Sequence, residues 1–358
     1  MSTFDYGNAR LRAMKSRLLS KREFDALLET DSLQGLITAL TGTAYRKTVE
    51  AALARTSGMD CIAQALRDDL VNTVGKVHKF YRGRAGEMTA MVLRIYDIQN
   101  LKAILRGLTK QVPLDEILFS VLPIGELEED LLSELARAPN PRAVIDLMAT
   151  MVLPFAQPLL QLRVDRPGAE ITEMELALDQ WFYRQSFQYL QTTRHVDGIL
   201  LSALQLEADL INLLTMLRFA HAPRERKFLR EWLHTDELER LLVGPGKLPF
   251  AMLVRAGRQD TVAAAVETLV GTPYKDPLEV GLKTYANSAL LSDIEKQLQR
   301  FRLIWMSRQI TKDPLGIGVL LGYLALKINE VNNIRWIAQG INLGFEEDNI
   351  RAELEYPP

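Results

Sequence analysis

Three segments of the chain repeat one arrangement of polar and apolar positions. Each has an acidic residue, an Asn three positions later, and apolar residues four and seven positions after the acid. The copies occupy Asp97–Gly107, Asp209–Arg218 and Glu330–Gly340. Successive acids lie 112 positions (209 minus 97) and 121 positions (330 minus 209) apart, so three units of this size account for nearly all 358 residues. The pattern predicts a molecule built from three repeats.

On a helix, each residue advances by about 100°, which places the acid, the Asn and the apolar positions of each copy on one face. Polar groups within an apolar face are tolerated when they find hydrogen-bond partners, here expected from neighbouring helices. A catalytic carboxylate could occupy the same position, but three equivalent copies favour the structural interpretation. The residues of this inter-helix polar signature are Asp97, Asn100, Arg106, Asp209, Asn212, Arg218, Glu330 and Asn333.

Long helical segments are expected before each signature helix, separated from it by a short turn. They are predicted at Asp60–Tyr81, Glu173–Arg194 and Pro277–Ile310. A second sequence similarity relates Leu40–Tyr45 to Leu269–Tyr274 at an offset of 229 (271 minus 42). The middle unit lacks the corresponding segment. Strand-like alternation is scarce. We therefore expect an all-α protein with three similar helical domains at residues 1–110, 111–222 and 223–358, the second of which has diverged.

Composition narrows the class of protein. Apolar residues make up 47% of the chain and charged residues 25%, as in ordinary globular proteins, and the net charge of −2 argues against a general nucleic-acid binder. The single Cys61 excludes an intrachain disulfide and suits a reducing compartment. The longest apolar run, Leu315–Leu326, is shorter than the roughly 20 residues that cross a bilayer. No signal-peptide pattern opens the chain. These features predict a cytoplasmic protein without membrane spans.

Candidate chemistry is sparse. The four histidines have no metal-ligand spacing, and one cysteine cannot build a thiolate site. Gly244–Leu248 contains Gly-Pro-Gly-Lys but lacks the first Gly and the Ser or Thr of a phosphate-binding loop, so it is interpreted as a turn. We expect no catalytic residue, no cofactor and no metal, and a monomer that neither binds nor hydrolyses ATP.

Residues 10–22 carry six basic residues and no acid. Leu11, Met14 and Leu18 form an apolar stripe beneath these bases, which would fix the helix against the core of the protein. A basic face of this kind could contact nucleic acid, lipid head groups or an acidic partner, or it could simply be solvated. Both interpretations stay open. The candidate partner contacts are Arg10, Arg12, Lys15 and Arg17.

The opening segment Tyr6–Leu19, with the sequence YGNARLRAMKSRLL, carries a family resemblance together with Asp97–Gly107 and Glu207–Arg218. These segments resemble the C subunit of archaeal and bacterial V-type (A-type) ATPases, the counterpart of the d subunit of eukaryotic V-ATPases. The resemblance extends from Tyr6 to about Tyr356 and departs from the family between Pro113 and Leu162.

The resemblance implies an all-helical, funnel-like body with three similar domains about a pseudo-threefold axis. It also implies a rotor part without an active site, which caps the membrane proteolipid ring on its cytoplasmic side and receives the tip of the central shaft. In this role the protein would couple ATP hydrolysis or synthesis to H⁺ or Na⁺ translocation. Its partners would be the shaft subunits and the ring, with no nucleic acid and only indirect membrane association.

Two other functions remain open. A helical-repeat adaptor unrelated to ATPases would bind soluble partners and would not purify with a proteolipid ring. An enzyme using Asp97, Asp209 or Glu330 as an acid or base would require a concave pocket that holds one of these carboxylates.

Overall fold

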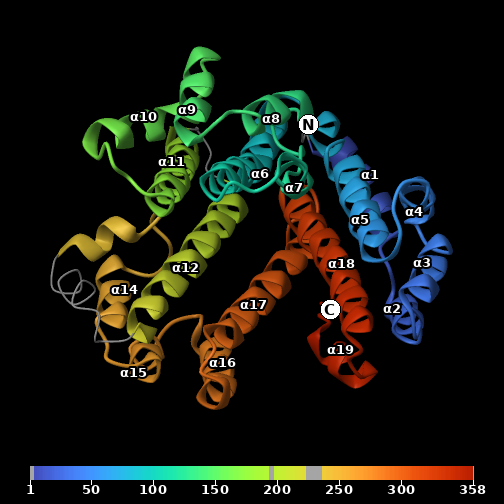
Figure 1. Ribbon diagram of the computed structural model, residues 1–358. Coiled ribbons are helices and arrows are strands. Elements are labelled where there is room, and N and C mark those ends of the chain that lie inside the picture. The colour runs from blue at the N-terminus through green and yellow to red at the C-terminus, as the bar shows by residue number, and fades with distance from the viewer. Residues whose placement is uncertain (1–3, 193–196, 223–235, 358) are drawn as a thin grey trace. The chain divides into compact units, whose positions relative to one another are not determined.

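The computed structural model describes residues 4–192, 197–222 and 236–357, and its ordered elements are helices (Figure 1). No strand occurs in these three ranges. The prediction of an all-α protein is therefore confirmed.

The chain divides into two compact units. Unit 1 consists of Met1–Asn100, Leu118–Ser133 and Leu303–Pro358, and unit 2 consists of Leu101–Ile117 and Glu134–Arg302. The division into three sequence domains stays a prediction, and residues 223–224 at its second boundary lie outside the described residues.

Unit 1 combines both ends of the chain, as the blue and red helices of Figure 1 show. Helices α5 and α18 pack against each other, and α1, α2 and α3 also contact α18. Helix α18 is thus covered by N-terminal helices. The elements that lie wholly in unit 1 are α1 (Asp5–Lys15), α2 (Lys21–Leu28), α3 (Leu33–Thr41), α4 (Arg46–Leu53), α5 (Gly58–Val74), η1 (Val77–Phe80), α18 (Gly318–Leu343) and α19 (Glu347–Glu353).

Unit 2 has α12 at its centre, in contact with α11, α14 and α15. Its elements are α9 (Pro141–Thr150), α10 (Ala156–Asp165), α11 (Ile171–Thr192), α12 (Gly198–His221), η2 (Asp236–Leu241), α14 (Phe250–Gly257), α15 (Val262–Glu267) and α16 (Lys275–Ser288). Four helices run across the division between the units: α6 (Gly83–Thr109), α7 (Leu114–Ser120), α8 (Glu129–Ala136) and α17 (Leu291–Lys312).

The helix starts repeat at fixed offsets. Helices α2, α3 and α4 begin at residues 21, 33 and 46, and α14, α15 and α16 begin 229 positions later, at 250, 262 and 275. In the middle third, α8 and α9 begin at 129 and 141, each 121 positions before α14 and α15. The N-caps agree, since Ser32, Asn140 and Thr261 each accept a hydrogen bond from the backbone N–H three residues later. Helix positions therefore repeat even in the middle third, where the sequence similarity between Leu40–Tyr45 and Leu269–Tyr274 has no counterpart.

Two helical segments are shorter than predicted. The segment expected at 60–81 ends as α5 at Val74, and a short 3₁₀ turn follows. The segment expected at 277–310 is two helices, because Ala289 adopts a left-handed conformation (φ 56°) that ends α16. Apolar periodicity continues through such a break, so it did not reveal the turn.

Helix α12 is the single candidate for a membrane span among the described residues, on length and composition alone. The sequence prediction, which relied on uninterrupted apolar runs, did not identify α12 as a candidate. However, 61% of its apolar window is buried within the protein, and its polar residues bond to later parts of unit 2. These contacts make α12 a core helix of that unit.

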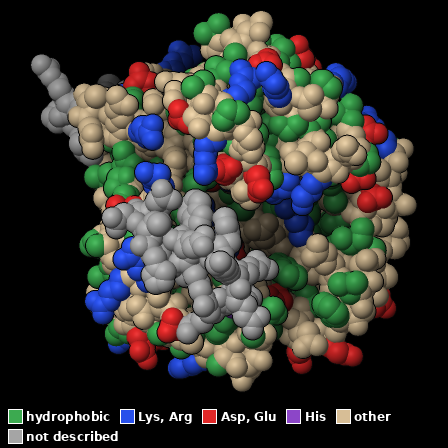
Figure 2. Space-filling view, turned by 60° about the vertical axis from the view of Figure 1, so that its left-hand side comes forward, with side chains coloured by type: hydrophobic (Ala, Val, Ile, Leu, Met, Phe, Trp, Pro, Cys, Tyr) green, Lys and Arg blue, Asp and Glu red, His purple; other side chains and the backbone are tan. Residues whose placement is uncertain are grey.

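Hydrophobic, basic and acidic side chains are interspersed on the face shown in Figure 2. Val152 and Val164 are the most exposed large hydrophobic side chains of the described residues, at 86% and 76%. Both valines line one cavity, formed by α9, α10 and the residues between these helices.

Candidate functional site

The signature Asn residues are buried, and each binds a peptide backbone farther along the chain. Asn100 donates from Nδ2 to the carbonyl of Leu122 (2.7 Å) and accepts from the N–H of the same residue (2.8 Å). Asn333 does the same with Glu355, at 2.9 and 3.2 Å. Both partners lie 22 positions after the Asn.

Asn212 forms a similar pair of bonds over two adjacent residues. Its Oδ1 accepts from the N–H of Val243 (2.9 Å), and its Nδ2 donates to the carbonyl of Gly244 (3.0 Å). Val243 and Gly244, like Leu122 and Glu355, lie outside helices. The expectation that partners come from neighbouring helices was therefore wrong, because non-helical segments have the unpaired backbone groups that an amide can satisfy.

Asp97 is fully buried and holds the same loop as Asn100. Its Oδ2 accepts from the N–H of Glu126 (2.8 Å) and its Oδ1 from that of Leu127 (3.0 Å). A Cβ atom at Gly125 would lie 2.2 Å from the carboxylate, so only glycine fits there. Burial raises the pKa of Asp97 to about 6 and outweighs the two backbone bonds, which lower it.

Asp209 repeats this geometry in unit 2. It accepts from the N–H groups of Lys247 (2.9 Å) and Leu248 (3.1 Å), and a Cβ at Gly246 would lie 1.7 Å from its Oδ1. The hydroxyl of Tyr274 donates to Asp209 at 2.8 Å. Burial again raises the pKa of the acid. The segment Gly244–Leu248 thus supplies two backbone donors to a carboxylate of the same chain.

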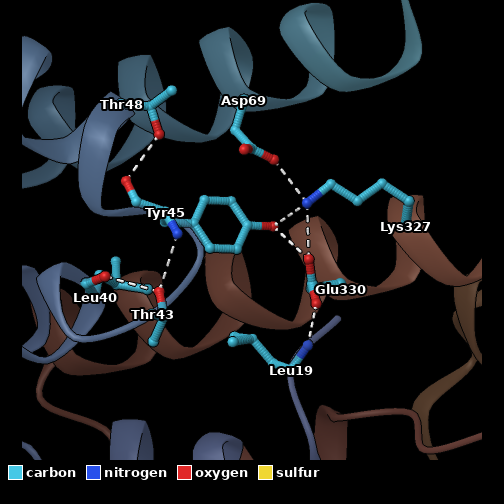
Figure 3. Close-up of polar contacts among 8 residues, drawn as sticks. All are labelled: Leu19, Leu40, Thr43, Tyr45, Thr48, Asp69, Lys327 and Glu330. Atoms are coloured by element: carbon cyan, nitrogen blue, oxygen red, sulfur yellow. Dashed lines mark hydrogen bonds and ion pairs between the residues drawn. The ribbon is translucent and has the colours of Figure 1, made fainter. Parts of the chain in front are cut away.

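Glu330 stands at the centre of a larger buried cluster (Figure 3). It accepts from the N–H of Leu19, from the hydroxyl of Tyr45 (2.7 Å) and from the ammonium group of Lys327 (2.8 Å). Lys327 also donates to the Tyr45 hydroxyl (2.9 Å) and forms an ion pair with Asp69 (2.6 Å). Burial and the two nearby carboxylates raise the pKa of Tyr45 well above its usual value.

Sequence reasoning missed most of the partners of these acids. The offset of 229 that relates Tyr45 to Tyr274 also relates Leu19 to Leu248. Extending this sequence comparison would therefore have identified the corresponding tyrosines and leucines that bind the acids. Lys327 could have been identified from the sequence, because it is the one charged residue between Leu315 and Asn329. No sequence pattern marks Gly125, since its role depends on the close approach of Asp97.

The two signature arginines lie apart from the buried acids. Arg106 forms a two-pronged ion pair with Glu175, at 2.9 and 2.8 Å, and Arg218 lies 4.0 Å from Glu295. Both arginines are at least half-exposed, where ion pairs contribute little to stability.

The bases of the N-terminal segment face outward, and α1 ends at Lys15, so Arg17 lies in the turn after this helix. Arg10, Arg12, Lys15 and Arg17 are all exposed, whereas Leu11 is fully buried beneath them. Arg10 donates to the hydroxyl of Tyr6 (2.6 Å) and lies over the ring of Phe80 (4.5 Å), and Arg12 donates to the carbonyl of Pro314. The hydrogen bonds of Asp97 and Asp209 come from other residues, so these arginines do not serve to pair those acids.

The opening segment fixes α1 within unit 1. A Cβ at Gly7 would lie 2.1 Å from the ring of Tyr81, whose hydroxyl donates to Asn8 (2.8 Å). The Asn8 amide in turn donates to the carbonyl of Gly316 (3.0 Å), in the turn before α18. Gly7 and Asn8 therefore attach α1 to Tyr81 and to the turn before α18.

The enzymatic interpretation requires a pocket around a signature acid. Three cavities of about 380, 380 and 450 Å³ are lined by residues of η2 and α14, of α9 to α11, and of α9 and α10, respectively. None of these three linings contains Asp97, Asp209 or Glu330. Across the described ranges, no cluster of three or more His, Cys, Asp or Glu residues could hold a metal ion.

The amino-acid sequence matches a known family. The family model described as ATP synthase (C/AC39) subunit matches residues 7–353. The chain belongs to this family. Two relatives, each named as the C subunit of an A-type ATP synthase, come from Methanosarcina acetivorans (27% identical, covering 99% of this chain and 93% of the relative) and Methanococcoides burtonii (28%, 99% and 94%). A third, from Halobacterium salinarum, bears the same name and is 26% identical over 99% of this chain and 97% of its own length. The predicted resemblance to the C subunit is confirmed at the level of the family.

Proposed function

We propose that the chain is a non-catalytic central-stalk subunit of a rotary V/A-type ATPase. It would link the soluble rotor shaft to the membrane proteolipid ring and so couple ATP hydrolysis or synthesis to H⁺ or Na⁺ translocation. The observation that carries this proposal is the match, over nearly the whole of both chains, to relatives named as the C subunit of A-type ATP synthases. The same proposal makes the chain a counterpart of the d subunit of eukaryotic V-ATPases.

The chemistry of the buried acids supports a non-catalytic role. Asp97 and Asp209 each bind two backbone N–H groups, and Glu330 binds an N–H, a hydroxyl and an ammonium group. A general acid or base must exchange a proton with a substrate within hydrogen-bond reach. Carboxylates whose oxygens already hold segments of their own chain are suited to structural work.

The proposal includes the molecular arrangement that the sequence predicts. Three similar domains at residues 1–110, 111–222 and 223–358 would surround a pseudo-threefold axis in a funnel-like body. The protein would act as a monomer within the complex, in the cytoplasm and peripheral to the membrane. The repeated helix starts and the repeated acid and Asn contacts support this arrangement.

The surface proposed to meet an acidic partner is the exposed face of α1 and the turn after it, with Arg10, Arg12, Lys15 and Arg17. Its bases can steer and orient a partner, while apolar contacts supply most of the binding energy. The burial of Leu11 supports this assignment, because it leaves the basic side turned outward.

Purification of the native complex tests the function. We expect the tagged full-length chain to capture both the shaft subunits and the proteolipid ring from detergent-solubilised membranes. The isolated chain should give no heat of binding when titrated with ATP, since it lacks a phosphate-binding loop.

A tagged chain expressed in cells without the other ATPase subunits provides the background for this capture. Soluble partners in place of the ring would support the adaptor alternative. Stoichiometric micromolar ATP binding would contradict the non-catalytic assignment.

A further inference from the structure

The cavity between α9, α10 and α11 has a basic rim. Its volume is about 380 Å³, and all three helices belong to unit 2 (Figure 1). Three arginines contribute to its lining: Arg142 near the start of α9, Arg163 in the last turn of α10, and Arg166 directly after α10. Within the described ranges, no carboxylate side chain lines this cavity. The charges of the lining therefore favour an anion.

Apolar side chains form the floor of the same cavity. Leu159, Leu162 and Arg163 lie on one face of α10, because positions three and four residues apart share one side of a helix. Ile145 from α9 and Met174 from α11 complete the floor. Ile145 and Leu159 are buried, at 2% and 1% exposure. A ligand in this cavity thus meets hydrocarbon and guanidinium groups together.

Two of the arginines have acidic partners that lie outside the lining. Arg163 donates to Asp146 (2.7 Å), and Arg166 pairs with Glu173. A third acid, Asp165 of α10, accepts from a glutamine amide (2.9 Å). Each guanidinium group has five N–H donors, so one carboxylate partner leaves donors that a second anion can use.

Arg142 supplies a positive charge without an acidic partner. Its side chain is exposed, and it forms neither an ion pair nor a hydrogen bond with the described residues. It is the second residue of α9, where backbone N–H groups lack acceptors within the helix. The dipole of α9 therefore favours an anion at the same end of the helix as this guanidinium group.

The other two cavities do not combine these features. Two arginines also line the cavity of η2 and α14, but Glu239 lines it as well, and its carboxylate opposes an anionic ligand. The cavity that contains Val152 and Val164 has no charged side chain among the described residues of its lining. Of the three cavities, the one between α9, α10 and α11 alone has an acid-free basic rim above apolar side chains.

We propose that this cavity binds an amphiphile with an anionic head group and an alkyl chain. The arginines bind the phosphate or carboxylate of the head group through charge-assisted hydrogen bonds, and the floor covers part of the chain. The volume lies within the range of small-molecule sites. No aromatic side chain of the described residues lines the cavity, so it lacks a stacking surface for a nucleobase. This inference does not depend on the proposed function.

Isothermal titration of the full-length chain with dodecyl phosphate, below its micelle concentration, tests the site. We expect saturable binding of one molecule per chain. Inorganic phosphate lacks the alkyl chain, and dodecyl maltoside has the chain with a neutral head group. Each should bind at least about tenfold more weakly, since each makes one of the two kinds of contact. Equal affinity for either of them, or no binding of dodecyl phosphate, would overturn the proposal.

A charge variant locates the binding. Arg142→Gln/Arg163→Gln should weaken the binding of dodecyl phosphate by about tenfold or more, because two charged donors are lost. The matched control Arg255→Gln/Arg258→Gln removes two arginines from the other cavity of about 380 Å³ and should bind as the wild type does. An unchanged affinity in the first variant, or an equal loss in the control, would contradict the assignment to this cavity.

A second variant tests the floor and keeps the proposal testable if the charge variant does not fold. Leu162 is half-buried, so Leu162→Gln should preserve the helical content measured by circular dichroism. It should weaken the binding of dodecyl phosphate by about tenfold while all three arginines remain, because the alkyl chain loses an apolar contact. Unchanged binding in this variant would show that the alkyl chain lies elsewhere and would overturn the proposal.

Free fatty acids and membrane phospholipids both carry this chemistry, and two further measurements distinguish them. Flotation of the chain with phosphatidylglycerol vesicles, but not with phosphatidylcholine vesicles, would identify a membrane phospholipid, provided that Arg142→Gln/Arg163→Gln abolishes it. Saturable binding of laurate without flotation would identify a free amphiphile. Failure of both measurements would count against the site.

Discussion

At the scale of single residues, the signature positions solve the problem of holding an irregular segment against a helix. A loop leaves backbone N–H and carbonyl groups unpaired, and burying them without partners costs free energy. An Asn side chain supplies one donor and one acceptor, which fits a peptide group, while a carboxylate accepts from two consecutive N–H groups. On the loop from Leu122 to Leu127, Asn100 binds the backbone at the start of the loop and Asp97 binds the N–H groups at its end.

Replacing a signature Asn should therefore lower the free energy of unfolding. Asn333→Leu removes the acceptor of the Glu355 N–H and one of the two amide donors to the Glu355 carbonyl, the other being Asn329, and we expect a loss of roughly 1–3 kcal/mol in the free energy of unfolding. The neighbouring Asn332 is exposed, so Asn332→Leu is the matched control and should change stability by less than about 0.5 kcal/mol. Denaturant unfolding measures both. Neutral results for Asn100→Leu, Asn212→Leu and Asn333→Leu together would refute the role of these bonds.

The raised pKa of Asp97 gives stability a pH dependence of definite sign. The folded protein keeps the proton of Asp97 up to a pH of about 6, whereas the unfolded chain releases it near the ordinary value of 3.8. Between these values the folded state binds more protons, so this group favours folding at low pH and its contribution falls as the pH rises. The total change is about 3 kcal/mol at most.

Urea unfolding of the wild type and of Asp97→Asn at pH 4, 5, 6 and 7 isolates this contribution. The stability of the wild type relative to the variant should fall from pH 4 to pH 6 and then level off. Other carboxylates contribute to both proteins and cancel in the difference. A difference that is constant over the whole range would mean that Asp97 has an ordinary pKa.

At the scale of elements, α1 shows how a helix can be fixed on one side and available on the other. Gly7, Asn8 and Leu11 lie buried within unit 1, while the bases face outward. The buried side determines where the helix lies. The basic side is free to change in charge without loss of these packing contacts.

Charge reversal at Arg10, Arg12 and Arg17 to Glu should therefore weaken assembly with the other ATPase subunits, more strongly at low salt, while the isolated protein keeps its helical content. Circular dichroism and a reconstitution assay measure the two effects. The control reverses Arg46, Lys47 and Arg55, which are also exposed and change the net charge equally. Intact assembly with an unstable isolated protein would refute the interface, and an equal loss of assembly in the control would show that net charge alone is responsible.

At the scale of the whole molecule, the order of segments in the sequence differs from their order of packing. The signature acid of α12 is held by the segment that follows it, whereas the signature acid of α18, near the end of the chain, is held by residues from its beginning. Arg351 also donates to Asp25, which adds a further contact between the first and last parts of the chain. Truncation at either end would therefore remove part of the interface around α18.

Periodicity predicted the helical class and the helices that carry the acids, because both depend on residues three and four positions apart. It did not predict the breaks after Val74 and at Ala289, since an apolar stripe can continue across a turn. Nor did it reveal the repeat of helix starts in the middle third. There, the cap position is shared as Asn140, although the sequence around it has diverged.

Taken alone, the sequence specified that the chain is all helical, that three helices carry an acid and an Asn on an apolar face, and that the basic residues of α1 lie opposite its apolar stripe. Which segments bind those acids became clear from the tertiary structure. The donors are mostly backbone N–H groups, which nearly every residue has, so no side-chain pattern marks Leu127, Leu248 or Leu19 as partners. The fit of Gly125 and Gly246 and the pairing of Lys327 with Asp69 likewise arise from close approach between distant parts of the chain, which local periodicity does not encode.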